Sequence, residues 1–252
     1  MNLIDLSVKK LSQSIRNNKV TSVDICKAFI KQIKKKESKV KAWEYFNEKK
    51  ILKEARKLDK KKKILKTIGP LYGIPVALKD IISTSDMPTK FGTRIKLKDY
   101  KKLDAQIVKI LKQAGAIIMG KTVTCELAFL SPSITKNPID LSRTPGGSSS
   151  GSAAVIAAKM APLSIGTQTG GSVIRPASFC GVVGYKPSYG LISTNGILKT
   201  SYHLDQVGVF GNSVEDVKIL SEILFSKDKL TKKNIIQKNL VLFFLKLIDG
   251  EM

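Results

Sequence analysis

Cysteine is scarce in this sequence. The 252 residues contain only Cys26, Cys125 and Cys180, which are too few and too scattered for a disulfide framework or a zinc site. The first 16 residues lack the apolar core of a secretory signal peptide, and no apolar run approaches the length that spans a membrane. These absences favour a reduced, cytoplasmic protein with no metal and no membrane partner.

Arginine is scarce as well, because only five of the 44 basic residues are arginine. The formal net charge of +24 is typical of proteins that bind nucleic acid. Arginine, however, is the residue that binds phosphates and bases bidentately. Lysine runs such as 34–36 and 60–63 are typical of solvated helix faces and loops. We therefore interpret the charge as a lysine-rich surface and expect no nucleic-acid partner.

Histidine occurs once, at His203. A Ser-His-Asp triad would have to use this residue. A lone histidine between Tyr202 and Leu204 is more often structural than catalytic, and nothing around it marks a site. The search for a general base therefore turns to lysine, which replaces histidine in some serine enzymes.

The remaining pattern is that of an α/β protein. Hydrophobic residues make up 42% of the chain and charged residues 25%, which is ordinary globular composition. Periodicity and capping signals predict helices over about 21–33, 43–58, 104–114 and 152–160, and short buried strands over 73–78, 116–119 and 163–165. Strands that alternate with helices predict a largely parallel, mixed sheet flanked by helices, preceded by a helical N-terminal portion.

One motif match is misleading. The segment from Gly115 to Thr122 fits the P-loop pattern G-x-x-x-x-G-K-[ST] letter for letter. A P-loop needs its intervening residues to form a loop around a phosphate, whereas residues 116–119 are Ala-Ile-Ile-Met and resemble a buried strand. We therefore do not expect nucleotide binding at Lys121.

Two glycine- and serine-rich segments carry the chemistry. They are Gly146–Ser152, which precedes a predicted helix, and Gly166–Ser172, which follows a predicted strand. Small residues over 169–172 allow a turn to expose several backbone N–H groups together, as an oxyanion hole requires. Ser172 ends that turn, in the position of a nucleophile.

Lys79 is the best candidate for the base. It ends the apolar run 73–78, where burial disfavours the ammonium ion and lowers the pKa of the amine. A neutral lysine can accept a proton from a serine.

With these residues the chain resembles the amidase signature family, over roughly residues 6–224. The resemblance depends on linked motifs in order: Gly73–Asp80, Gly146–Ser152, Gly166–Ser172, Arg175–Gly184, Lys186–Ser188, Leu204–Gly208 and Ser213–Asp216. Ser148 and Ser172 are 24 residues apart, which is the spacing of the family.

The resemblance implies a role for each matched residue. Ser172 would be the acyl nucleophile, Ser148 would relay the proton from behind a cis peptide bond, and Lys79 would be the base. The remaining assignments are an oxyanion hole formed with the N–H groups of Thr169, Gly170 and Gly171, and a bracing role for Thr167. The family implies hydrolysis of the carbon–nitrogen bond of a small linear amide through an acyl-enzyme, without a metal or organic cofactor.

Gln168 and Ile174 indicate which subgroup of the amidase signature family the chain resembles. Many family members, including the A subunits of tRNA-dependent amidotransferases, have Asp at the position of Gln168 and Arg at that of Ile174. The string from Gln168 to Pro176 more closely resembles stand-alone amidases of the malonamidase kind, in which the arginine at position 175 contacts the substrate carboxylate. We therefore assign Arg175 to substrate binding, together with Gly147. A purely structural Arg175 is an equal alternative.

The family is markedly longer than 252 residues, which predicts one C-terminally incomplete amidase domain. We divide it into a helical portion (1–65), a catalytic core (66–225) and an unmatched tail (226–252). Two further interpretations stay open beside the stand-alone amidase, which could form a homodimer. One is the A subunit of a tRNA-dependent amidotransferase, and the other is an inactive truncated fragment.

Overall fold

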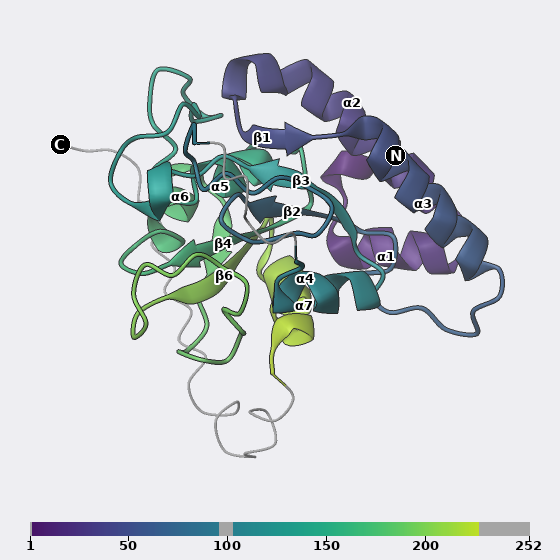
Figure 1. Cartoon of the computed structure of the whole chain (residues 1–252). Coiled ribbons are helices and arrows are strands. Elements are labelled where there is room, and N and C mark those ends of the chain that lie inside the picture. The colour runs from purple at the N-terminus through teal and green to yellow at the C-terminus, as the bar shows by residue number, and fades with distance from the viewer. Residues whose placement is uncertain (1, 96–102, 227–252) are drawn as a thin grey trace.

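The computed structural model describes residues 2–95 and 103–226 (Figure 1). The helices are α1 (Val8–Arg16), α2 (Ser22–Val40), α3 (Glu48–Lys62), α4 (Gln106–Gln113), α5 (Ser150–Ala157), α6 (Ile174–Phe179) and α7 (Val214–Leu224). The strands are β1 (Trp43–Phe46), β2 (Pro75–Lys79), β3 (Ile117–Thr122), β4 (Leu163–Gln168), β5 (Val183–Tyr185) and β6 (Gln206–Gly211). Short 3-10 turns cover Leu3–Asp5 and Glu126–Ala128.

The strands of this part of the chain form one sheet in the order β1-β3-β2-β4-β6-β5. The three central strands, β3, β2 and β4, run parallel. Strand β1 pairs antiparallel with β3 at one edge, and β6 and β5 add antiparallel strands beyond β4. The predicted α/β fold with a mixed sheet flanked by helices is confirmed, with the parallel pairing confined to the centre.

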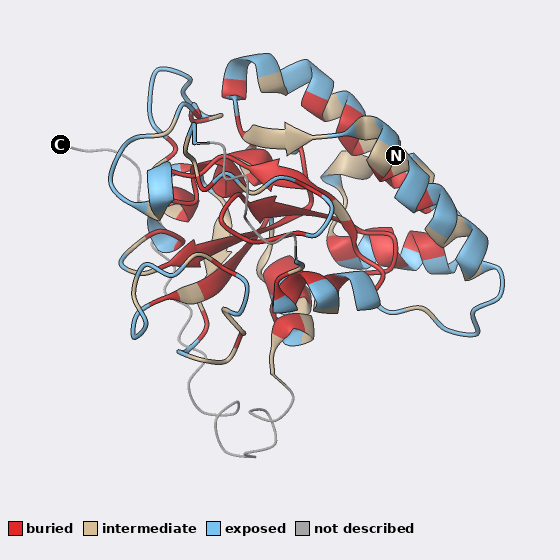
Figure 2. Cartoon of the chain, viewed as in Figure 1, coloured by how far each residue is buried: buried red, intermediate tan, exposed pale blue. Residues whose placement is uncertain are grey.

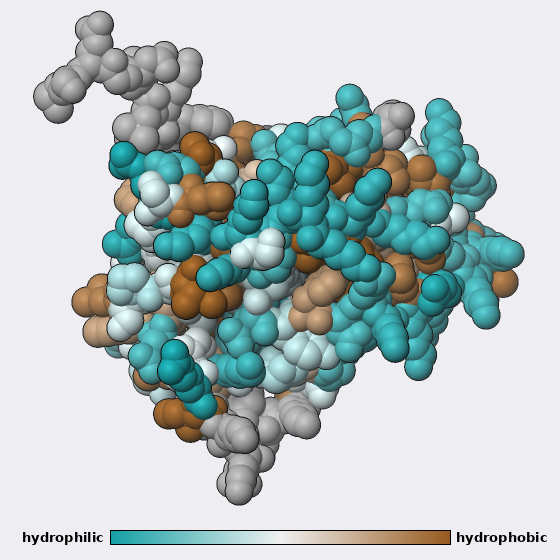
Figure 3. Space-filling model, turned by 90° about the horizontal axis from the view of Figure 1, so that it is seen from above, coloured by the Kyte–Doolittle hydropathy of each residue, from teal (hydrophilic) through white to brown (hydrophobic). Residues whose placement is uncertain are grey.

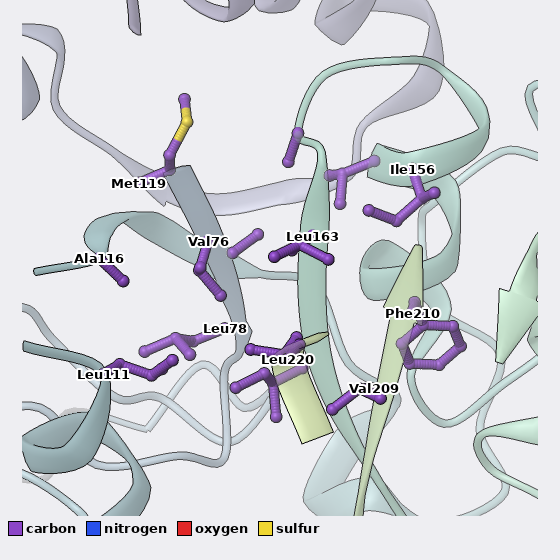
Figure 4. Packing of buried hydrophobic residues seen from close by; sticks show 14 of the residues in the cluster. Val76, Leu78, Leu111, Ala116, Met119, Ile156, Leu163, Val209, Phe210 and Leu220 are labelled. Atoms are coloured by element: carbon purple, nitrogen blue, oxygen red, sulfur yellow. The ribbon is translucent and has the colours of Figure 1, made fainter. Parts of the chain in front are cut away.

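The two faces of the sheet are covered by different helices. Leu111 of α4 and Leu220 of α7 lie near Leu78 on one face, and Ile156 of α5 lies near Phe210 on the other (Figure 4). Figure 2 shows the buried residues concentrated in the sheet and in the inward faces of these helices. The buried core is therefore continuous across the strands that carry the candidate motifs.

Helix α5 packs unusually close to the sheet. Its residues from Ser150 to Ile156 are all buried, as expected for a helix that is apolar on every side. A Cβ added at Gly151 would lie 2.4 Å from the carbonyl oxygen of Ala42 and 2.5 Å from the backbone nitrogen of Val123. The packing of α5 therefore requires glycine at position 151.

The N-terminal helices confirm one prediction and correct another. Thr21 and Asp24 form the predicted capping box at the start of α2. The helix expected over 43–58 is wrong at its start, because residues 43–46 form strand β1 and α3 begins at Glu48. Asn47 is the physical reason, since its side chain accepts a hydrogen bond from the N–H of Lys50 and starts the helix there.

Hydrophilic side chains dominate the face seen in Figure 3, including its right-hand part, where α2 and α3 lie in the related view of Figure 1. No helix within 2–95 or 103–226 is long and apolar enough to cross a membrane.

The predicted division of the chain at residues 65 and 225 stays a prediction. The expected tail, 226–252, lies outside the described residues except for Ser226.

Candidate active site

Lys79 lies at the end of the central strand β2 and is completely buried. Its Nζ donates to the hydroxyl oxygens of Ser148, at 2.7 Å, and Thr167, at 2.9 Å. Burial lowers the pKa of Lys79 to about 7, because the surroundings solvate the ammonium ion poorly. Near neutral pH a large fraction of this lysine is therefore neutral and able to accept a proton.

Ser148 lies two residues before the start of helix α5, and the peptide bond between Gly147 and Ser148 is cis, as the resemblance implied. The carbonyl oxygen of Ser148 accepts hydrogen bonds from the N–H of Cys125 and the hydroxyl of Thr124, both at 3.1 Å. The segment after β3 therefore holds the backbone of Ser148 while its side chain faces Lys79.

Ser172 lies at the end of the turn that leaves β4, at 9% exposure. Its hydroxyl forms no hydrogen bond to any residue that the structure describes. Within the turn Gly170 is exposed and Thr169 is half-buried, and a Cβ added at Gly170 would meet nothing within 4 Å. The turn is therefore open at Gly170, two residues before the largely buried Ser172.

The side chain of Gln168 binds the backbone where this turn leads into α6. Its side-chain oxygen accepts hydrogen bonds from the backbone N–H groups of Val173, at 2.8 Å, and Ile174, at 3.0 Å. Both groups lie at the start of α6, where N–H groups have no partner within the helix. Sequence reasoning used Gln168 only to choose a subgroup and missed this role.

Arg175 is exposed at the start of α6. Its Nε donates to the carbonyl oxygen of Gly147 at 3.2 Å, and its guanidinium lies alongside Gly171. Gly147 is closely packed on its other side, since a Cβ there would lie 2.6 Å from the sulfur of Cys125. The two residues assigned to substrate binding therefore contact each other at the edge of the site.

A cavity of about 790 Å³ lies next to the Ser148 loop. Val123 and Thr124 line it from the sheet side, and Thr93 and Ser131 are among its other lining residues. Since the Thr124 hydroxyl also donates to the carbonyl oxygen of Ser148, this cavity adjoins the backbone of that serine. Lys79, Ser148 and Ser172 are not among its lining residues.

Asp205 is a site residue to which sequence reasoning assigned no role. It lies in the motif 204–208, and it is buried beside the turn that holds Ser172. Its carboxylate accepts a hydrogen bond of 2.5 Å from the hydroxyl of Thr169. The motif alone could have drawn attention to the residue, but not to this contact.

The structure also shows the P-loop match and the single histidine, two features that the sequence analysis set aside. Residues 117–122 form β3, so the P-loop pattern spans a strand and not a phosphate-binding loop. Lys121 is buried and paired with Asp80, at 3.2 Å between Nζ and Oδ1. His203 is exposed on a loop. Within the described ranges no group of three or more His, Cys, Asp or Glu could hold a metal ion.

Comparison with known proteins shows the family of this chain. The chain belongs to the amidase family, whose model matches residues 24–241. It is 43% identical over 236 residues to the A subunit of a glutamyl-tRNA(Gln) amidotransferase from Clostridium acetobutylicum, covering 91% of this chain and 49% of that protein. The A subunit of the same kind of enzyme from a Sulfurihydrogenibium species is 41% identical, with 90% and 48% covered.

Among solved structures, a peptide amidase from Stenotrophomonas maltophilia matches with a TM-score of 0.83 at 32% identity. That match covers 89% of this chain and 48% of the neighbour. The chain thus spans about half the length of the curated relatives that it matches.

Proposed function

We propose that this chain carries the catalytic machinery of an amide-hydrolysing enzyme that acts through an acyl-enzyme on Ser172. The observation that carries the proposal is the buried Lys79, with its pKa lowered to about 7 and its Nζ 2.7 Å from the hydroxyl of Ser148. An amine held neutral next to a serine is the arrangement that a proton relay needs.

In the first half of the reaction, Ser172 Oγ attacks the amide carbonyl carbon. The Ser172 proton passes to Ser148 Oγ as the Ser148 proton passes to Lys79 Nζ. Backbone N–H groups of the turn 169–172 stabilise the negative oxygen of the tetrahedral intermediate. When the carbon–nitrogen bond breaks, the proton returns through Ser148 to the leaving nitrogen, which departs as ammonia or an amine.

In the second half, water attacks the ester between the acyl group and Ser172. The same relay removes a proton from the water and returns one to Ser172 Oγ as the acid is released. Each proton taken up by Lys79 is given back within the same half-reaction, so the cycle regenerates the free enzyme.

We further propose a small acid amide as substrate, with Arg175 binding its carboxylate. The guanidinium is exposed at the edge of the site and uses one N–H on Gly147, which leaves donors for a bidentate contact.

A second candidate is supported by the relatives at 41–43% identity, which are named as A subunits of glutamyl-tRNA(Gln) amidotransferases. In that case the amide would be that of glutamine, and the released ammonia would pass to a partner. Ammonia release from glutamine, and copurification of further subunits from the native host, would favour this candidate over the stand-alone amidase.

The test of the shared chemistry is intact-mass analysis after treatment with a serine-reactive fluorophosphonate. We expect one adduct on the parent chain and none on Ser172→Ala, with peptide mapping that places the adduct on Ser172. Circular dichroism of both chains controls for folding. A folded parent that stays unlabelled would support the inactive fragment and reject the proposed function.

A further inference from the structure

The carboxylate of Asp205 joins two loops beside the turn 169–172. Its Oδ1 accepts the Thr169 hydroxyl at 2.5 Å, and its Oδ2 accepts the backbone N–H groups of Thr200 at 2.6 Å and Ser201 at 2.9 Å. The residue is only 9% exposed. Hydrogen bonds to an ionised carboxylate are short and strong, and in a buried site they fix the groups that donate them.

The sheet topology explains why Asp205 reaches the turn. Strand β6 pairs antiparallel with β4, and Gln206 lies opposite Gln168 in the last pair of the ladder. One residue further out, Asp205 precedes β6 and Thr169 follows β4, so their side chains meet at the end of the ladder. The turn is therefore held from both sides, by Asp205 at its start and by Gln168 at the first residues of α6.

We propose that Asp205 is a positioning residue of this site, whose carboxylate fixes the turn 169–172 through the hydroxyl of Thr169 and thereby aims the oxyanion-binding N–H groups. The proposal rests on the proposed function, because it assigns a role within the same reaction. Oxyanion binding depends on donors held in place before the charge develops. If Asp205 only held the 200–201 loop through Oδ2, its Oδ1 would not need the hydrogen bond from Thr169.

The charge of Asp205 also acts on the base. Nζ of Lys79 contacts the hydroxyls of Ser148 and Thr167, Cys125 and Asp205 act on it electrostatically, and the neighbouring Asp80 is paired with Lys121. Burial lowers the pKa of Lys79, and the Asp205 charge partly opposes that effect. Removing the charge should therefore move the pH midpoint of the reaction downward, which loss of packing alone would not do.

Three variants separate these effects when fluorophosphonate labelling rates are measured across pH. Asp205→Asn removes the charge and one of its acceptors, whereas Thr169→Val removes only the hydroxyl and keeps the charge. Asp140→Asn is the matched control, because the Asp140 carboxylate also accepts a serine hydroxyl and a backbone N–H, but on an exposed loop.

We expect Asp205→Asn and Thr169→Val to label about tenfold to a hundredfold more slowly at the high-pH plateau, since small misplacements of catalytic groups cost rates of this order. The midpoint should move to lower pH in Asp205→Asn and stay at the parent value in Thr169→Val. Asp140→Asn should behave as the parent does. Thermal unfolding of each variant controls for folding.

A parent-like plateau in Thr169→Val would overturn the proposal, because it would show that the contact with Thr169 does not position the turn. If Asp205→Asn does not fold, Thr169→Val alone tests the positioning role of Asp205. A slow Asp205→Asn with an unmoved midpoint would overturn the effect of its charge on Lys79. An unlabelled parent would instead reject the proposed function, and the role of Asp205 with it.

Discussion

Nζ of Lys79 lies 2.7 Å from Oγ of Ser148, although the two residues are 69 positions apart in the chain. The contact forms because β2 and the loop before α5 meet at the same place, where the carboxyl ends of the parallel strands β2 and β4 lie side by side. Such sheet ends are where open α/β folds generally bind their ligands. The same location brings Thr167, at the end of β4, within 2.9 Å of the lysine.

The first prediction concerns the pH dependence of labelling. Below the pKa of about 7 Lys79 is protonated and cannot accept a proton, and above it the amine is neutral. The labelling rate should therefore rise with pH through a midpoint near 7 and then level off. Lys79→Met, which keeps the apolar bulk without the amine, should lose this rise and label at least about a hundredfold more slowly.

A pH profile that is flat from about pH 6 to 9 in the folded parent would argue against Lys79 as the base, because a general base must lose its proton to act. The reagent's own hydrolysis, measured without protein at each pH, is the control for this experiment.

The second prediction concerns Arg175. If its guanidinium binds a substrate carboxylate, Arg175→Ala should lower kcat/KM for the acid amide about tenfold to a hundredfold, as expected for one charged hydrogen-bonded contact. The neutral amide of the same length should change much less. Arg175→Lys should recover little, because an ammonium cannot make the bidentate contact. Equal losses for both substrates would mean that Arg175 has a structural role through Gly147.

The third prediction concerns the packing of α5. Gly151→Ala should destabilise the fold by about 1–3 kcal/mol, the usual cost of overpacking a tight contact, since its new Cβ would lie 2.4 Å from the carbonyl oxygen of Ala42. Gly170→Ala is the matched control, because its Cβ would meet nothing within 4 Å. Urea unfolding measures both. A parent-like stability of Gly151→Ala would show that the contact relaxes without cost.

The fourth prediction concerns the buried pair of Lys121 and Asp80. Lys121→Ala leaves a buried carboxylate without its partner and should cost about 3–5 kcal/mol of unfolding free energy. Lys218→Ala breaks an exposed pair with Glu222 and should cost less than about 1 kcal/mol. Urea unfolding measures both variants, and equal losses would mean that burial does not set the value of the Lys121 pair.

ATP with Mg²⁺ should leave the unfolding temperature of the parent unchanged, since residues 117–122 form a strand. Stabilisation by the nucleotide would restore the P-loop interpretation that we reject.

The sequence by itself determined the family of this protein and predicted its candidate catalytic residues. The motifs 146–152 and 166–172 predicted the two candidate serines, and the apolar run that ends at Lys79 predicted the buried lysine that the structure shows, because those signals are local in the chain. Alternating strand and helix patterns likewise predicted the α/β class. The helix starting at Thr21 was predictable for the same reason, since a capping box needs only four consecutive residues.

The tertiary structure alone decided the features that depend on distant partners. Residues 43–46 carry a helical pattern, yet they pair with residues 120–122 as the edge strand β1. Asp205 gains its partner only because β6 lies antiparallel to β4, which brings it to Thr169 across 36 positions. Strand pairing joins segments that are far apart in the chain, and no local pattern specifies which segments meet.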